Sequence, residues 1–260
     1  MTREQIVARA LGYPFERPPT SVAIVGDRVL ELVELDGADL GASTVRDGHE
    51  TLTLADACAR ARLAPDELSA PRTAVLAYGS NASPASVRWK FPGARDSLTP
   101  LLSGAIRDHD VVYSAHISVY GSVPATLQRS PATEVQTFVA LLTDAQLERV
   151  GAWEINARYE TLRGVDLSLD HGQPPADVGA YISSHGCLAV NGREVALAAV
   201  SARGRRLPEM TEPEALGHVR DRVAPGATLD DFILACVGDY DIARGHTAAL
   251  RATARPFAGR

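Results

Sequence analysis

The chain has 260 residues and a formal net charge of −6, and 45% of its residues are hydrophobic and 22% charged. These proportions are typical of a globular protein that buries a sizeable core. The acidic balance argues against a nucleic-acid partner, which would need a basic face. No stretch approaches the ~20 apolar residues of a membrane span. We therefore expect neither a nucleic-acid nor a membrane partner.

Cysteine usage bears on the cellular setting. The three cysteines, Cys58, Cys187 and Cys236, are far apart, odd in number and outside any Cys-x-x-Cys pair. They are therefore not a disulfide framework, and no signal-peptide segment follows Met1. We expect three free thiols in a cytoplasmic protein. The sequence does not indicate an oligomeric state.

The N-terminal part of the chain has its own succession of elements. Its patterns predict a helix over 2–11, a β-hairpin over 21–33, a polar Gly-rich loop over 36–50 and a helix over 51–63. We interpret residues 1–70 as a small appended unit that packs on the rest of the chain.

The next stretch combines an apolar strand with a tight turn. Val75–Tyr78 has strand character, Gly79, Ser80 and Asn81 are turn formers, and Ser83-Pro84 is typical of a helix start. Because Gly79 has no Cβ, successive N–H groups of the turn can point into one concavity. Such a concavity suits a carboxylate or phosphate. The alternative is an ordinary strand-to-helix connection.

The rest of the chain is rich in strands in its middle and in helices near its ends. The predicted helices span 84–91, 143–153, 229–237 and 242–251, and Pro92-Gly93 ends the first of them. The predicted strands span 98–107, 110–116, 124–128, 135–142, 159–169, 178–183, 188–190 and 195–200, with His109 near the turn between the first two. Since strands and helices do not alternate, we expect an α+β fold with a mixed or antiparallel, barrel-like sheet and flanking helices.

Several short pieces occur in an order that identifies a family. Ala77-Tyr78-Gly79-Ser80-Asn81 is followed by Gly104, by Pro124-Ala125 and by Trp153-Glu154. In this order they resemble the γ-glutamylcyclotransferase-like family. The resemblance covers roughly residues 73–182 and, more loosely, 226–250. It implies a catalytic domain over 71–260, in which about 183–225 is an insertion.

Glu154 is the main candidate for chemistry. It directly follows Trp153 at the end of the helix predicted over 143–153. A carboxylate beside an aromatic side chain is partly desolvated and accepts a proton more readily near neutrality. The alternative is a surface glutamate at a helix end. The family resemblance implies that Glu154 is the general acid/base.

The resemblance also implies the reaction. The turn Gly79-Ser80-Asn81 would hold the α-carboxylate of a γ-glutamyl amide or amine. Glu154 would take a proton from the substrate's α-ammonium group, which then attacks the γ-carbonyl and releases 5-oxoproline and a free amine. Because the nucleophile is tethered, neither a metal nor another cofactor is expected. The sequence contains no His-Glu-x-x-His or other tight metal-ligand cluster.

Further residues complete the expected substrate site. The residues predicted to bind substrate are Tyr78, Gly79, Ser80, Asn81, Ala82 and Tyr181. The alternative for Tyr78 is a tyrosine of the core. Ala82 departs from the larger apolar residue of relatives, and the insertion leaves the amine partner open. The chain could therefore act on a different amide, or only bind a small ligand.

Two features of the positive charge complete the inventory. The cluster Arg203-Gly204-Arg205-Arg206 could hold an acidic substrate group, with a solvated turn as the alternative. Lys90 is the only lysine, which we attribute mainly to the base composition of the source.

Overall fold

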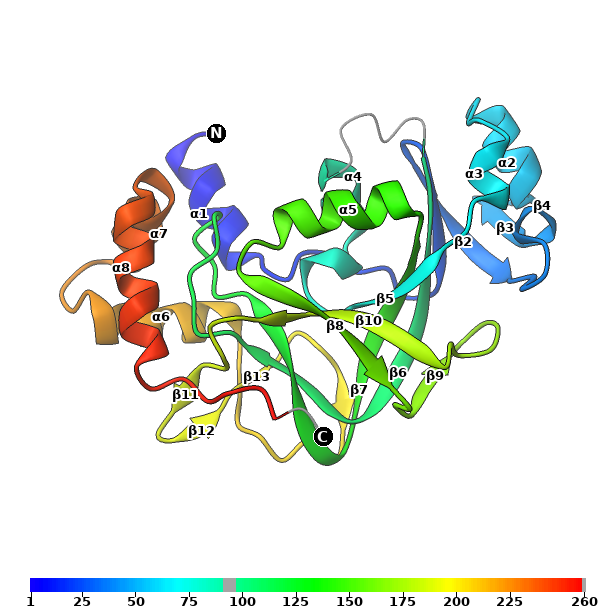
Figure 1. Cartoon of the computed structure of the whole chain (residues 1–260). Coiled ribbons are helices and arrows are strands. Elements are labelled where there is room, and N and C mark those ends of the chain that lie inside the picture. The colour runs from blue at the N-terminus through cyan, green and yellow to red at the C-terminus, as the bar shows by residue number, and fades with distance from the viewer. Residues whose placement is uncertain (91–96, 259–260) are drawn as a thin grey trace.

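Two long antiparallel strands organise the molecule. β6 (Leu98–Tyr113) pairs with β7 (Ala125–Leu142) along most of their length. They form the centre of a large mixed sheet in the computed structural model, which describes residues 1–90 and 97–258 (Figure 1). The expected α+β class is confirmed at this level.

The sheet has 13 strands within the described residues, and its main path runs β4-β3-β2-β1-β6-β7-β5-β10-β8. The shorter strands on this path are β1 (Val22–Val25), β2 (Arg28–Glu34), β3 (Thr44–Asp47), β4 (Glu50–Thr53), β5 (Thr73–Ala77), β8 (Ala157–Arg163) and β10 (Asp177–Ser183). β5 and β10 pair in parallel, whereas the other neighbours on the path are antiparallel.

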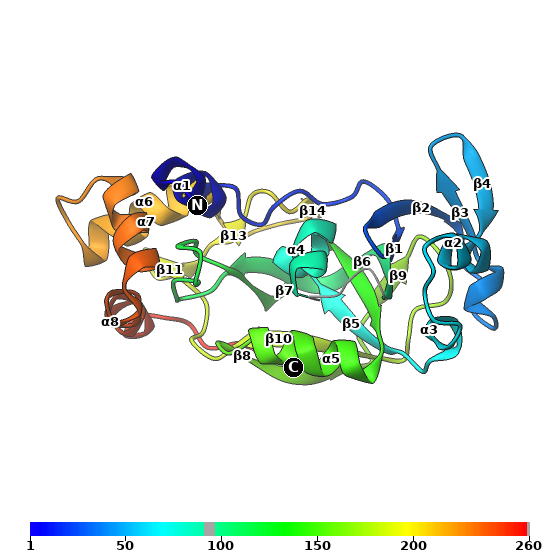
Figure 2. The same cartoon turned by 90° about the horizontal axis from the view of Figure 1, so that it is seen from above.

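Helices gather at three places around this sheet. The helices are α1 (Arg3–Leu11), α2 (Leu54–Arg60), α3 (Asp66–Ser69), α4 (Pro84–Lys90), α5 (Asp144–Trp153), α6 (Glu212–Val223), α7 (Leu229–Gly238) and α8 (Tyr240–Arg251). α4 and α5 lie over one face of the sheet. α1 and α6–α8 lie at one end of the molecule, and α2 and α3 lie with β3 and β4 at the other (Figure 2).

The alternation of residues along β5 explains why both faces of the sheet are covered. Leu76 and Tyr78 belong to the main core, whereas Val75 and Ala77 belong to a second cluster. Successive side chains of a strand point to opposite faces, so the apolar run of β5 requires cover on both. The second cluster also contains Val87 of α4 and Val150 of α5, both of which are buried. The two helices therefore cover this face of the sheet.

The N-terminal hairpin continues the main sheet. β1 pairs with β2 on one side and with β6 on the other, and Ala10 and Tyr13 are buried in the main core. The predicted first helix and hairpin are thus present. The division of the chain at residue 70 stays a prediction.

The loop predicted over 36–50 is wrong in part, because this segment contains the 3₁₀ turn Leu40–Ala42 and the strands β3 and β4. Each strand buries one apolar side chain, Val45 or Leu52, among polar ones. This pattern is too sparse to predict a strand. The helix predicted from residue 51 begins at Leu54, with Thr53 as its N-cap.

The turn predicted near His109 is also wrong. β6 runs through this position with a shift in pairing between Arg107 and His109. Asp108 adopts a positive φ of 55°, and its carboxylate accepts a hydrogen bond from the Ala132 N–H at 2.8 Å. The polar residues therefore form an irregularity inside a strand pair. The two strands predicted over 124–142 are likewise one strand, β7.

The strand predicted over 178–183 is present in full as β10, whereas the other later strands are shorter than predicted. The segment 159–169 is divided into β8 and β9 (Leu167–Leu169) around Gly164, which has a φ of +60°. The remaining short strands are β11 (Ala189–Val190), β12 (Arg193–Glu194), β13 (Ala196–Leu197), β14 (Ala202–Arg203) and β15 (Glu209–Met210). β13 pairs with β6, and β14 pairs with β7. The predicted helix end at Pro92-Gly93 lies outside the described residues.

Two further expectations concern the chain as a whole. The cysteines Cys58, Cys187 and Cys236 are buried and free, as predicted. Among the described helices, none combines the length and the apolar character that crossing a membrane requires. The cytoplasmic location stays a prediction.

Candidate functional site

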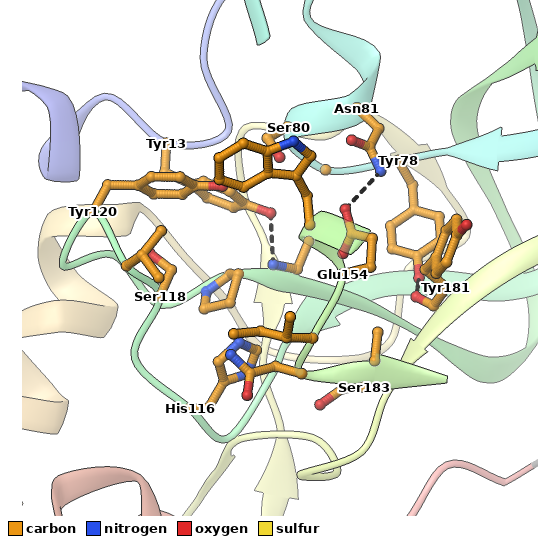
Figure 3. A pocket seen from close by; sticks show the side chains of 18 of the residues that line it. Tyr13, Tyr78, Ser80, Asn81, His116, Ser118, Tyr120, Glu154, Tyr181 and Ser183 are labelled. Carbon is orange, nitrogen blue, oxygen red and sulfur yellow. Dashed lines mark hydrogen bonds between the residues drawn. The ribbon is translucent and has the colours of Figure 1, made fainter. Parts of the chain in front are cut away.

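A cavity of about 100 Å³ opens where β5 ends between α4 and α5. Its walls come from the turn after β5, the ends of both helices, the start of β7, the segment 116–120 and β10. Glu154 lies between Asn81 and the rings of Tyr78 and Tyr181, and Tyr13 and Tyr120 lie on the opposite side (Figure 3). The cavity thus joins segments that are distant in the sequence.

Local sequence places Glu154 in this cavity. Thr143 and Gln146 form a capping box that begins α5. The Gln146 amide also donates to the Leu98 carbonyl at 3.1 Å and to the Thr99 hydroxyl at 3.0 Å, which ties the helix to β6. Glu154 is the C-cap residue of the same helix. A helix fixed at its start therefore presents the carboxylate at its end.

Glu154 belongs to a charged cluster with Lys90 and Asn81. Its Oε1 accepts hydrogen bonds from Lys90 Nζ at 2.8 Å and from Asn81 Nδ2 at 3.0 Å. Lys90 Nζ also donates to Asn81 Oδ1. The Lys90 side chain is only 5% exposed and that of Glu154 is 23% exposed. We call these three residues the Glu154 cluster.

One oxygen of the cluster remains open. Within the described part of the chain, Glu154 Oε2 accepts no hydrogen bond. It is not a buried atom either. The carboxylate is therefore held through one oxygen and can accept a proton or a hydrogen bond through the other.

The turn Gly79–Asn81 lines the same cavity. The N–H groups of Ala82 and Ser83 bond back to the carbonyls of Gly79 and Ser80. The N–H groups of Gly79, Ser80 and Asn81 donate to no acceptor among residues 1–90 and 97–258. Three free donors in sequence suit an anionic group.

Glycine is required at position 79 because of a close approach. Its φ is −107°, which is outside the left-handed region. A Cβ at this position would lie 2.5 Å from Tyr13 Oη and 3.3 Å from the Ala125 Cβ. A larger residue would thus displace the tyrosine from the cavity wall.

Both predicted tyrosines line the cavity. Tyr78 is buried in the main core and its hydroxyl donates to the Tyr181 carbonyl. Burial and the nearby charge of Glu154 raise the pKa of Tyr78, and the same two causes raise the pKa of Tyr181 to about 12. Both hydroxyls therefore stay protonated at neutral pH. Tyr78 therefore lines the cavity and is at the same time a tyrosine of the core.

Ala82 does not line the cavity. Its side chain is fully buried and belongs to the second cluster. In the short 3₁₀ helix Ser80–Ala82 it faces away from the cavity and packs beneath α4. Of the six residues predicted to bind substrate, the structure brings five to one cavity with Glu154, and Ala82 is the exception.

The sequence analysis missed several residues of the cavity wall, and two of them, Lys90 and Tyr13, form hydrogen bonds there. Lys90 had one signal, since it is the only lysine of the chain. Tyr13 had none, because it comes from the segment outside the family resemblance. Its hydroxyl accepts a hydrogen bond from the Ala125 N–H at 2.7 Å. Burial raises the pKa of Tyr13 well above its usual value.

A hydrogen-bonded histidine lies on the cavity floor. His116 Nδ1 is 2.6 Å from the Ser114 hydroxyl, which is 2.6 Å from the Ser183 hydroxyl. The His116 ring lies against the His185 ring with centroids 4.8 Å apart. Burial and the neighbouring His185 lower the pKa of His116 to about 3, so His116 is neutral at physiological pH.

Other sequence candidates lie outside the cavity. Arg205 forms a buried ion pair with Asp110, and Arg203 is exposed. Of the predicted insertion 183–225, only Ser183 lines the cavity. Among the described residues, no group of three or more His, Cys, Asp and Glu side chains could hold a metal ion.

Neither a family model nor a curated protein matches the chain. Any functional assignment therefore depends on the geometry of this cavity.

Proposed function

We propose that the protein is a cofactor-free cyclotransferase that acts on a γ-glutamyl amide or amine and releases 5-oxoproline and a free amine. With this we propose that the sheet is the barrel-like sheet of γ-glutamylcyclotransferase-like proteins. The observation that supports both is one cavity lined by Glu154, whose Oε2 accepts no hydrogen bond from the described residues, and by Gly79–Asn81, whose N–H groups have no acceptor among them.

The turn would hold the substrate's α-carboxylate. Hydrogen bonds between N–H groups and an ionised carboxylate are shorter and stronger than neutral ones. The donors are backbone groups fixed by the 3₁₀ helix Ser80–Ala82, so little ordering is needed when the carboxylate binds. Ser80 lines the same cavity.

Glu154 would move the proton. Oε2 accepts a proton from the substrate's α-ammonium group, and the resulting amine attacks the γ-carbonyl carbon. The new C–N bond closes a five-membered lactam. The amide C–N bond then breaks as Glu154 returns the proton to the leaving nitrogen. The ring nitrogen gives up its second proton, which the released amine takes up to become an ammonium ion. A tethered nucleophile removes much of the entropic barrier, so one positioned carboxylate suffices.

Lys90 would position this carboxylate. Its ammonium group and the Asn81 amide hold Oε1 at 2.8 and 3.0 Å. Because Oε1 is occupied, Oε2 is the oxygen that remains for the substrate. The ammonium group also compensates the carboxylate charge, and the Lys90 side chain is itself only 5% exposed.

One observation favours a non-catalytic alternative. The Lys90–Glu154 contact is also what a structural ion pair would show, and a protein with such a pair could use the turn only to bind a small carboxylate. A related enzyme acting on a different amide would use the same groups. Turnover of γ-glutamyl compounds distinguishes these possibilities.

The test is a panel of γ-glutamyl amides and amines incubated with the full chain, with 5-oxoproline and the free amine measured together. We expect equal amounts of the two products from at least one compound. Binding of γ-glutamyl compounds without 5-oxoproline would favour the binding protein. Release of the amine with free glutamate would identify a hydrolase.

A further inference from the structure

The mouth of the cavity is lined by large apolar side chains that are open to solvent. Trp89, Val119, Trp153 and Ile155 line the cavity and are 46%, 56%, 43% and 66% exposed. We call these four residues the apolar rim. A contiguous group of exposed apolar side chains around a cavity is typical of a binding surface.

The two tryptophans flank the groups of the proposed reaction. Trp89 precedes Lys90 at the end of α4, and Trp153 precedes Glu154 at the end of α5. Their ring centroids are 4.6 Å apart with an interplanar angle of 45°. A substrate group that extends from Glu154 towards solvent between these residues would therefore contact the indole rings.

Arg9 contacts one residue of the apolar rim, Trp89, and also Tyr120. The Arg9 guanidinium lies 5.1 Å from the Trp89 ring centroid and 5.2 Å from that of Tyr120. Such cation–π contacts orient both rings. Arg9 itself does not line the cavity, so its charge is directed to the ring faces.

The described residues that line the cavity offer no unpaired charge to an ionic leaving group. Among the described residues that line it, Lys90 and Glu154 are the only Lys, Arg, Asp or Glu side chains, and they contact each other. His116 is neutral because burial lowers its pKa to about 3. An ionised group placed against the rim would lose water, and Arg9, the cation that contacts the rim, lies outside the cavity with its charge at the ring faces, so the burial of that ionised group is unfavourable.

We propose that the amine released by this protein is uncharged apart from its reacting nitrogen and carries an aromatic or bulky alkyl group that packs on the apolar rim. This inference depends on the proposed cyclotransferase activity, because it concerns the leaving side of that substrate. It excludes γ-glutamyl dipeptides as the preferred class, since their leaving group is an amino acid with a carboxylate.

Three substrates test the two parts of this inference separately. γ-Glutamyl phenethylamide and γ-glutamyl ethylamide differ by the phenyl group, whereas γ-glutamyl phenethylamide and γ-glutamyl phenylalanine differ by one carboxylate. We expect kcat/KM for the phenethylamide to exceed each of the others by about tenfold or more, from the apolar area buried and the charge desolvated.

Variants connect the preference to the rim. Trp89→Ala should reduce the ratio of phenethylamide to ethylamide turnover towards one, and Ile155→Ser provides a second rim variant if Trp89→Ala folds poorly. Tyr240→Ala is the matched control, because Tyr240 is 67% exposed on α8 and does not line the cavity. It should leave the ratio unchanged.

The outcomes separate the two proposals. If 5-oxoproline forms and the phenylalanine or ethylamide compound is the equal of the phenethylamide, the apolar-rim inference is wrong and the cyclotransferase proposal stands. If rim variants leave the ratio unchanged, the rim is not the cause and the inference is likewise overturned. If no compound yields 5-oxoproline, both proposals fail together.

Discussion

Two of the buried ion pairs among the described residues, Lys90–Glu154 and Arg205–Asp110, differ in the surroundings of their carboxylates. Lys90 Nζ lies 2.8 Å from Glu154 Oε1, and Arg205 Nη2 lies 2.9 Å from Asp110 Oδ1. Each pair joins segments more than 60 residues apart in the sequence. Both pairs have at least one side chain that is at most 5% exposed.

Their second oxygens have different surroundings. Both carboxylate oxygens of Asp110 accept hydrogen bonds from the Arg205 guanidinium, and Oδ1 also accepts one from the Val111 N–H. Its side chain is fully buried. Glu154 is contacted through Oε1, while no described residue donates a hydrogen bond to Oε2. The comparison teaches that buried charge alone does not indicate a site. The open oxygen is what distinguishes the Glu154 carboxylate and is the reason that we propose a reaction there.

The largest effect on activity is expected when the Glu154 carboxylate is replaced by an amide. Gln in place of Glu154 can still accept from Lys90 and Asn81, but it cannot take up a proton and return it. A positioned general acid/base contributes about 10²–10⁴-fold in rate. We therefore expect Glu154→Gln to lower kcat at least about a hundredfold, with little change in unfolding midpoint.

The matched control for this variant is Glu148→Gln, an exposed glutamate of the same helix. It should turn over substrate at the wild-type rate. Wild-type turnover by Glu154→Gln would show that another group transfers the proton.

The converse effect is expected at Asp110. Removing one member of a buried ion pair costs about 3–5 kcal/mol in folding free energy because the remaining charge is left unpaired. We expect Asp110→Asn to be at the lower end, since Arg205 also contacts Glu209. Urea unfolding measures the loss, and kcat per folded molecule should stay at the wild-type value.

An exposed ion pair provides the reference for this loss. Asp241 contacts Arg244 at 3.0 Å, and both side chains are more than two-thirds exposed. Asp241→Asn should cost less than about 1 kcal/mol. A decrease in kcat for Asp110→Asn would contradict the assignment of that pair to the framework alone.

Lys90→Met sharpens the comparison within the Glu154 cluster. The variant keeps the length of the side chain but releases Oε1 from the ammonium group, so the carboxylate is held by Asn81 alone. Loss of positioning of a reacting group lowers rates by about ten- to a hundredfold. We expect a decrease in kcat of this size and a smaller change in KM, measured by steady-state 5-oxoproline release.

Two results would contradict this role. An unchanged kcat would show that Lys90 has no part in positioning Glu154. A decrease as large as that of Glu154→Gln would indicate that Lys90 carries the proton itself.

Local patterns account for the parts of the structure that the sequence predicted. The capping boxes of α1 and α5 and the two-residue turn of the first hairpin depend on neighbours in the chain, so they are visible in the sequence. The turn Gly79–Asn81 was predicted from its turn formers and Glu154 from its place after Trp153, and the family resemblance assigned both to one site.

The missed features depend on contacts between distant segments. Lys90 reaches Glu154 across 64 residues, and Tyr13 reaches Ala125 across 112. Neither contact leaves a local pattern. The irregularity at Asp108 was taken for a turn because the same polar residues occur in both. Ala82 was assigned to the cavity because the direction of a side chain in a single 3₁₀ turn is not legible from the sequence.

The smallest expected effect asks whether His116 belongs to the site or to the framework. Its pKa is lowered from 6.5 to about 3, first by burial and then by His185. When the pH falls below about 6.5, the His116 imidazole becomes protonated in the unfolded chain but stays neutral in the folded protein. Stability is therefore lost as the pH falls from about 6.5 towards 3, by up to about 1.4 kcal/mol per pH unit.

His116→Gln removes this titration while it keeps a polar group beside Ser114. Urea unfolding of the wild type and the variant at pH 7, 6 and 5 gives the difference in their unfolding free energies. We expect this difference to change in favour of the variant as the pH falls, because only the wild type has a neutral buried imidazole to protect. Parallel pH profiles would contradict the assigned burial of the ring.

Since His116 is neutral throughout this range, kcat of the wild type should show no dependence on its ionisation. A rate that follows a group lost in His116→Gln would instead place the histidine among the reacting groups.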